Sequence, residues 1–357
     1  MIHSEISHHR LVAQKLYKTS SCLPQEIVKH FGAMQAQDYA MAKWAIGSRC
    51  DFSEKKIEEA INSGKIIRTH ILRPTWHFVS SEDIYWMMDL SAPQVKRFTA
   101  SAAKKFGYDD KKLNQTNNSI EKLLTGNNHL TRNEIMQELG ITKTGSEDFL
   151  SAAIMMNAEL DGLVCNGKMK GKQITYALLE ERVPKPKTKL SKEEALAKLA
   201  QRYFESHGPA TVSDFSWWSG FPPTICQKAI NAIGLQLSHV TIDNQQYWFK
   251  KDCLDADSFR ESVHFLPAFD EILISYKTRE ASFNTEHQSK VFTNNGIFKP
   301  IILENGKVIG IWKRTVKKDH VKIETEFFKE TESSKKEILF EGIKAFETYL
   351  ETKIVIG

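Results

Sequence analysis

Groups of short helices that each precede a β-hairpin recur three times along this chain. In each instance, segments with a helical spacing of apolar residues come before two short β-like runs, which turn residues separate. Helices followed by a two-stranded wing are the order of the winged-helix form of the helix-turn-helix motif. One occurrence would be weak evidence, because small helical groups with hairpins are common. Three occurrences predict a helix-rich α+β chain with tandem winged-helix domains.

The first instance ends in a hairpin that contains a proline. Pro74 has no backbone N–H to donate to a strand partner, so we expect it in the turn at Leu72-Arg73-Pro74 or at a sheet edge. The expected helices are Leu11–Tyr17, Gln25–Met34, Tyr39–Ser48 and Ser53–Asn62, and the expected strands are Lys65–Ile71 and Thr75–Ser80.

Capping boxes open the second and third instances. Thr131 with Glu134 has the spacing in which side chain and backbone cap each other at a helix N-terminus, and Ser191-Lys192-Glu193-Glu194 repeats it. The other expected elements are the helices Thr131–Leu139, Ser146–Leu160, Val212–Trp218 and Pro223–Ile233, and the strands Gly162–Cys165, Gln173–Leu178, Leu235–Thr241 and Tyr247–Lys250, the last two turning at Asp243 and Asn244.

The C-terminal end of the chain has a different pattern. Alternating runs at Phe298–Leu303, Val308–Lys313 and His320–Glu326 predict strands, and a charged helix is expected at Ser333–Glu351. Two prolines and three lysines within 183–189 predict an extended linker after the second instance. The expected domains are a first winged-helix domain with extra helices (1–125), a second (126–183), a third (190–260) and a β-rich C-terminal domain closed by a helix (261–357).

Composition places the 357-residue chain among ordinary globular proteins that bury a large core. No apolar run approaches the roughly 18 residues that cross a bilayer, and the first residues carry no secretory signal, so no membrane partner is expected. Five scattered cysteines without a Cys-x-x-Cys pair disfavour disulfides and structural zinc, which favours the cytoplasm. The net charge of +5 permits nucleic acid as a partner without requiring it.

Two glutamines and an aspartate follow an apolar helix face at Met34-Gln35-Ala36-Gln37-Asp38. Residues two apart share a face in an extended segment and point apart on a helix. Gln35 and Gln37 therefore converge on one water molecule only if the helix has ended by Gln35. The alternative, and the commoner role of an isolated Gln-x-Gln, is a polar helix terminus that hydrogen-bonds to solvent.

Basic and aromatic side chains cluster in the first hairpin. Guanidinium forks suit phosphates, and tryptophan and histidine rings can stack on bases. The alternative is a half-buried wing: Trp76 and Phe78 are two residues apart and share a strand face, which favours the core for at least one of them. The candidate DNA-binding or pocket residues here are Arg68, His70, Arg73, Trp76 and His77.

A second basic segment is the loop of the second hairpin. Lys168, Lys170 and Lys172 surround an apolar Met169, which suits a wing tip that follows phosphates and wedges a base step. A charged tip that only keeps the protein soluble is the commoner alternative.

Two carboxylates are accessory candidates. Asp38 either supplies negative potential beside the glutamines or caps the next helix, and Asp270, together with the adjacent Glu271, either acts as an acid or base or ends a strand. The chain contains no P-loop, dinucleotide-binding glycine motif, zinc-protease motif or nucleophile elbow, so nucleotide hydrolysis, nicotinamide chemistry and lipase-type catalysis lack support.

Several segments together resemble the AlkZ-like winged-helix DNA glycosylases. The block Arg68–Phe78 combined with Gln35-Ala36-Gln37-Asp38 is specific, whereas either alone is weak. The similarity spans nearly the whole chain and is least distinctive over 102–128. The matching segments are Phe31–Tyr39, Arg68–Phe78, His207–Thr211 followed by Asp214, Phe215, Trp217 and Trp218, Leu266–Glu271, and Val308–Arg314.

The resemblance implies a concave DNA-binding surface made of tandem winged helices. It also implies excision of alkylated purines, notably N7-alkylguanine and, in some members, interstrand cross-links. The family's catalytic element is Gln-x-Gln or Gln-x-Asp, and this chain matches the first form at Gln35 and Gln37. The implied partner is double-stranded DNA with alkylated purines, and the chemistry requires neither a metal nor a redox cofactor.

Two other functions remain open at this point. One is a non-catalytic winged-helix regulator, and the other is an interaction module that no longer binds DNA. A regulator usually needs a two-fold dimer to match a palindromic site, and the sequence contains no evident dimerisation helix. We therefore expect a monomeric, monofunctional DNA glycosylase.

Overall fold

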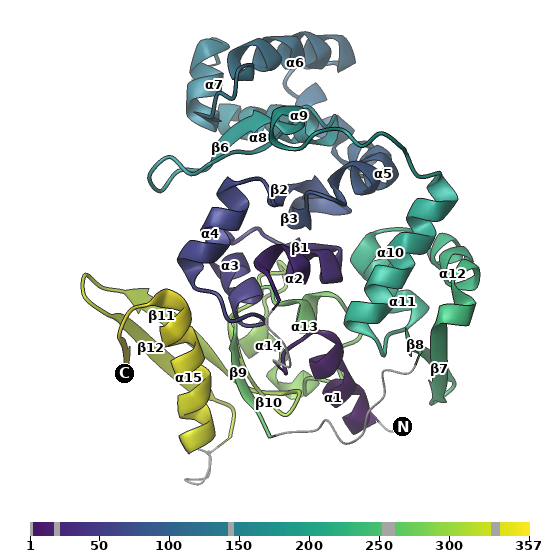
Figure 1. The fold of residues 1–357 in the computed structure, drawn as a ribbon, viewed down its shortest axis with the longest axis vertical. Coiled ribbons are helices and arrows are strands. Elements are labelled where there is room, and N and C mark those ends of the chain that lie inside the picture. Colours follow the sequence, from purple (N-terminus) through teal and green to yellow (C-terminus); the bar gives the residue numbers. More distant parts are fainter. Residues whose placement is uncertain (1–2, 18–21, 142–145, 252–260, 330–335) are drawn as a thin grey trace. The chain divides into compact units, whose positions relative to one another are not determined.

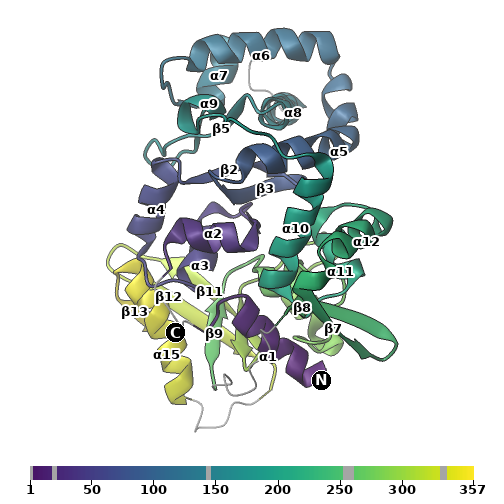
Figure 2. The same ribbon diagram turned by 45° about the vertical axis from the view of Figure 1, so that its right-hand side comes forward.

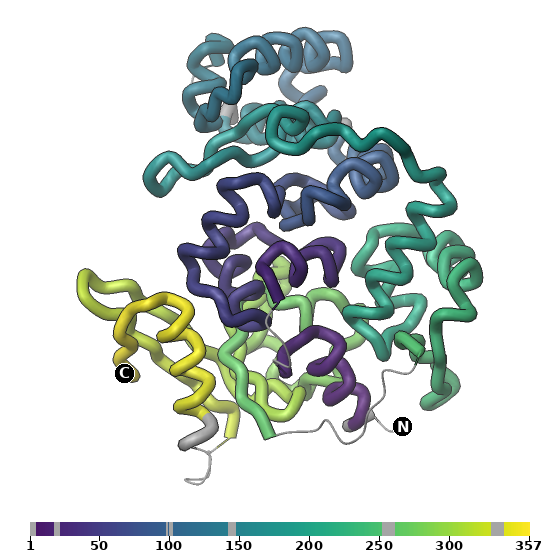
Figure 3. The backbone as a smooth tube through the Cα atoms, in the orientation of Figure 1, coloured from purple at the N-terminus to yellow at the C-terminus, as the bar shows by residue number. Residues whose placement is uncertain are grey.

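Two compact units make up the structure, a computed structural model that describes residues 3–17, 22–141, 146–251, 261–329 and 336–357. Unit 1 comprises Met1–Glu58 and Leu196–Gly357, and unit 2 comprises Glu59–Ala195. Unit 1 is thus assembled from both ends of the chain, coloured purple and green to yellow in Figure 3. These units cut across the four expected domains, whose boundaries stay a prediction.

Unit 1 contains the N-terminal helices, the third hairpin and a C-terminal sheet (Figure 1). α4 (Glu54–Asn62) and α10 (Lys192–His207) each span a boundary between the units. The other elements are α1 (His3–Ala13), α2 (Pro24–Phe31), β1 (Ala33–Gln35), α3 (Tyr39–Gly47), α11 (Val212–Ser219), α12 (Pro223–Ala232), η1 (Gly234–Gln236), β7 (Leu237–Ile242), β8 (Gln245–Lys250), β9 (Val263–Leu266), α13 (Glu271–Ile274), η3 (Thr285–His287), α14 (Gln288–Val291), β10 (Ile301–Glu304), β11 (Lys307–Val316), β12 (Val321–Phe327), α15 (Lys336–Leu350) and β13 (Ile354–Ile356).

The C-terminal sheet has five strands in the order β13-β12-β11-β10-β9. All neighbouring strands are antiparallel except β12 and β13, which are parallel. Helix α15 lies against this sheet (Figures 1 and 2), and its Phe346 ring meets the Trp312 ring of β11 with 5.2 Å between centroids. The expected β-rich C-terminal region with a closing helix is confirmed. Ser333, the expected start of that helix, lies outside the described residues.

Unit 2 contains the first two hairpins and the long helices α5 (Ile84–Lys104) and α6 (Asp110–Leu124), which the sequence patterns did not predict. The other elements are β2 (Ile66–Ile71), β3 (Arg73–Ser80), β4 (Leu130–Thr131), α7 (Arg132–Glu138), α8 (Ser146–Leu160), β5 (Val164–Asn166), β6 (Thr175–Leu178) and α9 (Leu179–Arg182). Helix α5 packs against α8 and against the hairpin of β2 and β3 (Figure 2).

Within the described residues, no helix combines the length and the apolar character that crossing a membrane requires.

Local capping and turn signals are confirmed where the sequence placed them. Both capping boxes form: the Thr131 N–H donates to Glu134 at 2.7 Å, and the Ser191 N–H donates to Glu194 at 2.8 Å. The third hairpin turns at Asp243 and Asn244, which have φ of 48° and 61°. Consecutive positive φ values are typical of a two-residue hairpin turn that matches the strand twist.

Several boundaries differ from the sequence expectations. The first helix is His3–Ala13 rather than Leu11–Tyr17. The second ends at Phe31 rather than Met34, because Gly32 has φ of 78° and leaves the helical conformation. In the first hairpin β3 begins at Arg73, because Leu72 alone makes the turn with φ of 60°, and the exposed Pro74 lies within β3.

The half-buried imidazole of His30, on α2, makes the stability of the fold depend on pH. It donates a hydrogen bond to the Ala13 carbonyl at 2.7 Å, and burial lowers its pKa to about 4. The unfolded chain binds this proton near the ordinary histidine pKa of about 6.5, so acid favours unfolding between these two values. We expect the free energy of unfolding in urea to fall from pH 7.5 to pH 5. The fall is expected to be smaller in His30→Gln; an equal fall in both would contradict the assignment.

Candidate active site

The two glutamines of the candidate motif leave helix α2 and enter an extended segment. Gln35 is the last residue of β1, so the condition that the helix has ended by Gln35 is met. Gln35 is half-buried and Gln37 is exposed, while Ala36 between them is buried. The Oε1 atom of Gln35 is buried and has no hydrogen-bond partner among the described residues. A buried acceptor that lacks a protein partner can accept a hydrogen bond from a bound water or from a substrate group. Convergence of the two amides on one water stays a prediction.

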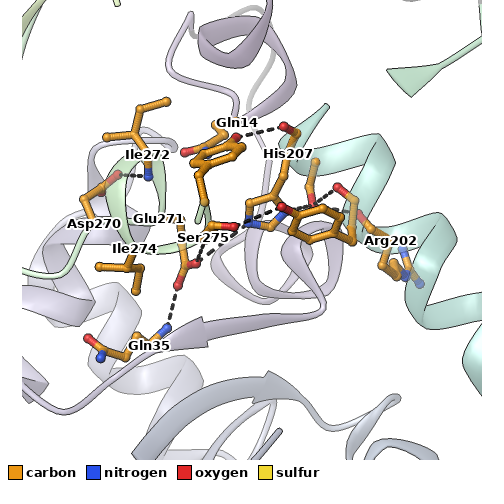
Figure 4. A network of polar contacts seen from close by, with 12 residues as sticks. Gln14, Gln35, Arg202, His207, Asp270, Glu271, Ile272, Ile274 and Ser275 are labelled. Atoms are coloured by element: carbon orange, nitrogen blue, oxygen red, sulfur yellow. Dashed lines mark hydrogen bonds and ion pairs between the residues drawn. The ribbon is translucent and has the colours of Figure 1, made fainter. Parts of the chain in front are cut away.

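The backbone of Gln35 is held by a carboxylate from the other end of unit 1. Its N–H donates to Oε1 of Glu271 at 2.7 Å, whereas its side chain extends away from Glu271 (Figure 4). Glu271 is the first residue of α13, is 2% exposed, and also accepts a hydrogen bond from the Ser275 hydroxyl. Burial raises the pKa of Glu271, but contacts with His207, Ser275 and the Gln35 amide outweigh it and leave the pKa below its ordinary value. Glu271 is therefore ionised at neutral pH.

His207 approaches the other oxygen of the Glu271 carboxylate, the one that does not accept the Gln35 N–H. Its Nε2 is 3.7 Å from Oε2 of Glu271, and its Nδ1 is 2.7 Å from the Ser206 hydroxyl. The ring stacks on Tyr203 with 4.7 Å between centroids and meets Phe31 edge-on at 5.2 Å. Burial among these rings lowers the pKa of His207, although Glu271 acts to raise it. The imidazole is thus a buried neighbour of the carboxylate rather than a solvent-exposed base.

The two accessory carboxylates have defined structural contacts. Asp38 caps α3 by accepting a hydrogen bond from the Met41 N–H at 3.1 Å. Asp270 caps α13 through the Ile272 N–H, and both of its oxygens accept hydrogen bonds from the Arg49 guanidinium at 2.8 Å. Asp270 and Arg49 are each 2% exposed. For Asp38 the structure shows the helix capping that the sequence left open. For Asp270 it shows a helix cap and a buried ion pair, neither of which the sequence predicted. An accessory role of either carboxylate stays a prediction.

The first hairpin carries a buried polar network in unit 2. His70 contacts Glu159, which is 0% exposed, and the Trp76 indole N–H donates to the same carboxylate at 3.3 Å. The Arg68 guanidinium lies 4.5 Å from the Trp76 ring centroid and donates to the Asn166 side chain. These contacts hold β2 and β3 against α8 and β5.

Burial separates the hairpin candidates into two groups. Arg68, His70 and His77 are at most 4% exposed, whereas Arg73 and Trp76 are half-buried. The Phe78 side chain is fully buried, as expected for at least one of the two aromatic residues on that face. This burial favours a structural role for the first three. A DNA contact from any of the five residues stays a prediction.

The lysine loop joins β5 to β6 at an exposed tip. Lys168, Lys170 and Lys172 are exposed, and Lys170 pairs with Glu134 of α7 at 2.5 Å. The backbone of Lys170 forms a bridge with Gln173, so the tip is a tightened extension of the hairpin. The glutamine motif and Asp270 belong to unit 1, whereas the first hairpin and the lysine loop belong to unit 2.

Sequence reasoning did not predict the contacts of two of the buried carboxylates. Glu271 stood beside Asp270 in a segment noted for its carboxylates, yet its contact with Gln35 spans 236 residues and leaves no local signal. Glu159 has the spacing of an ordinary helical residue in α8. Among the described residues, no group of three histidine, cysteine or acidic side chains is placed to hold a metal ion.

Comparison with known proteins places this arrangement in a family. A model of the family described as DNA glycosylase AlkZ-like matches residues 28–347. The chain is 21% identical over 324 residues to the interstrand DNA cross-link repair glycosylase of Streptomyces sahachiroi, with 85% of each protein covered. It also matches the solved structure of Streptomyces sahachiroi DNA glycosylase AlkZ with a TM-score of 0.79, at 17% identity and over 100% of both chains, which shows a shared fold. Because the family model covers most of its length, the chain belongs to the AlkZ-like DNA glycosylases, a family of N-glycosyl hydrolases.

Proposed function

We propose that this protein is a monofunctional DNA glycosylase that hydrolyses the N-glycosidic bond of N7-alkylated purines in duplex DNA. Gln35 and Gln37 position the attacking water. The observation that carries this proposal is the buried Oε1 of Gln35, without a partner among the described residues, at the end of an extended Gln-x-Gln segment. Family membership supports the reaction class.

Two neutral amides are sufficient for this reaction because the substrate is already activated. Alkylation at N7 places a positive charge on the purine, so the base leaves without further protonation. The enzyme then has to hold the sugar, place a water opposite the leaving base and tolerate oxocarbenium-like charge. An amide both accepts from and donates to such a water, and it introduces no unpaired buried charge. This weak activation predicts little activity on uncharged, stable purines.

Glu271 does not serve as the general base in this proposal. Its Oε1 accepts the Gln35 N–H, and its other oxygen faces Ser275 and His207. Because both oxygens already face donors inside the protein, the proposal gives Glu271 no contact with the attacking water. The water therefore meets the amide side chain of Gln35, which extends away from this network (Figure 4).

Bulky and cross-linked adducts are proposed as substrates because a relative is described as an interstrand DNA cross-link repair glycosylase. Such lesions do not fit a tight base-flipping pocket, and we propose that the exposed lysine loop contacts the DNA backbone. We further propose that the protein binds duplex DNA as a monomer through its winged-helix domains.

The lysine loop gives this proposal a quantitative test. Replacing Lys168, Lys170 and Lys172 together by alanine is expected to weaken binding equally across duplex sequences. The slope of log affinity against log salt is expected to fall by as much as about 3, if each lysine meets one phosphate. The slope is measured by fluorescence anisotropy over a series of salt concentrations, and an unchanged slope would remove the loop from the interface.

The proposed activity is tested by incubating the purified protein with N7-methylated duplex DNA. Free 7-methylguanine and abasic sites are expected in equal amounts, without strand cleavage by a lyase step. The same incubation with undamaged duplex serves as the control. Duplex binding without base release would support the non-catalytic DNA-binding protein instead.

A further inference from the structure

We propose that Glu271 is a positioning residue for catalysis, which fixes the backbone of Gln35 so that its amide meets the attacking water. This inference rests on the proposed function and assigns a role to a side chain outside the glutamine motif. The contact that carries it is the 2.7 Å hydrogen bond from the Gln35 N–H to Oε1 of Glu271.

Gln35 needs such a support because regular structure ends at this residue. β1 contains only Ala33–Gln35, and the next residues, up to the helix that starts at Tyr39, belong to no helix or strand. A hydrogen bond to an ionised acceptor is roughly twice as strong as one between neutral groups. Because Glu271 is buried and ionised, it restrains the Gln35 backbone more firmly than a neutral acceptor would.

The helix that carries Glu271 is itself fixed at its C-terminal end. Three side chains donate hydrogen bonds to successive carbonyls: Arg279 to Leu273 at 2.8 Å, Trp217 to Ile274 at 2.9 Å, and Tyr203 to Ser275 at 2.9 Å. A four-residue helix has little rigidity of its own, so these contacts determine where Glu271 lies.

The N-terminal end of the same helix is fixed by the Asp270–Arg49 ion pair, in which two hydrogen bonds of 2.8 Å are formed. Arg49 follows α3, which begins shortly after the glutamine motif. The position of Glu271 relative to β1 is thus determined from both ends of α13. Catalysis is sensitive to such placement, because an error of about 1 Å at the reacting atoms can lower a rate about 100-fold.

The test compares Glu271→Gln with the wild type on a duplex that contains a single 7-methylguanine. The glutamine keeps the shape of the side chain and removes the charge. We expect the single-turnover rate constant for base release to fall about 10- to 100-fold. The dissociation constant for the duplex is expected to change by less than about 2-fold, because Glu271 is buried.

A double-mutant cycle separates positioning from general damage to the fold. In a Gln35→Asn background, which shortens the amide, Glu271→Gln is expected to cause almost no further loss, because both changes disturb the same group. Asp214→Asn is the matched control: this carboxylate is 1% exposed and accepts a backbone N–H from Lys277 at 2.9 Å. When Asp214→Asn is combined with Gln35→Asn, the fold-reductions of the rate constant from the two variants are expected to multiply. Ser275→Ala, which removes a donor to Glu271, carries the same test if Glu271→Gln does not fold.

The outcomes distinguish this inference from the proposed function. A wild-type protein that releases no base overturns both. An active wild type with an unimpaired Glu271→Gln variant overturns the positioning role alone. The positioning role is also overturned if Glu271→Gln weakens DNA binding as much as it slows excision. It is overturned as well if the fold-reduction of the rate constant by Glu271→Gln multiplies with that by Gln35→Asn.

Discussion

Gln37→Ala and Gln35→Ala are each expected to reduce the release of 7-methylguanine to the rate of its spontaneous loss from DNA. In the proposed mechanism each variant removes an amide that holds the attacking water, and no other side chain is assigned to place that water. Duplex affinity is expected to stay nearly intact, because phosphate contacts dominate binding. The measurement is single-turnover base release by chromatography, with the dissociation constant obtained on the same duplex.

Gln288→Ala provides a matched control for the glutamine variants. It removes an exposed glutamine at the start of α14, outside the Gln-x-Gln segment, and is expected to leave base release unchanged. Full activity in the Gln35→Ala/Gln37→Ala double variant would refute the proposed mechanism. Equal losses of binding and excision would instead point to a general role of β1 in DNA contact.

Asp270→Asn is expected to lower the free energy of unfolding by about 3–5 kcal/mol, the typical effect of leaving one member of a buried ion pair without its partner. All three guanidinium nitrogens of Arg49 donate hydrogen bonds within the protein: two to Asp270, and others to Gln14, Ala45 and Ser48. Loss of the Asp270 charge leaves a buried cation uncompensated. Urea unfolding monitored by tryptophan fluorescence measures the change.

A surface ion pair is the control for this second variant. Glu324 pairs with Lys313 at 3.2 Å, and these side chains are 35% and 69% exposed. Glu324→Gln is expected to change the free energy of unfolding by no more than about 1 kcal/mol, because solvent screens exposed pairs. Similar effects from both variants would mean that the Asp270–Arg49 pair does not stabilise the fold as its burial indicates.

Local sequence signals were sufficient for much of the fold. Thr131 with Glu134, and the turn at Asp243 and Asn244, were located because their chemistry acts within four residues. The end of α2 was misplaced because Gly32 precedes more apolar residues that continue the helical spacing, so periodicity alone could not show the break. Helix boundaries are decided by such competing signals.

The candidate site was predictable only in part. Gln35 and Gln37 were identified from their residue types and the resemblance, whereas the contact between Gln35 and Glu271 depends on tertiary packing. The first hairpin shows the same limit. Arg68 and His70 have the chemistry of DNA-binding residues, but Asn166 and Glu159, which lie far along the chain, contact them within the protein. Burial of this kind is set by distant elements and has no periodic signature.

The construction of unit 1 from both chain ends has a consequence for biosynthesis. During translation, Gln35 leaves the ribosome long before Glu271 has been added to the growing polypeptide. Closing so long a loop comes late in folding, since distant pairings form only after the entropy of the intervening chain has been overcome. A nascent or prematurely terminated product that ends before residue 271 therefore lacks the carboxylate that accepts the Gln35 N–H in the folded protein.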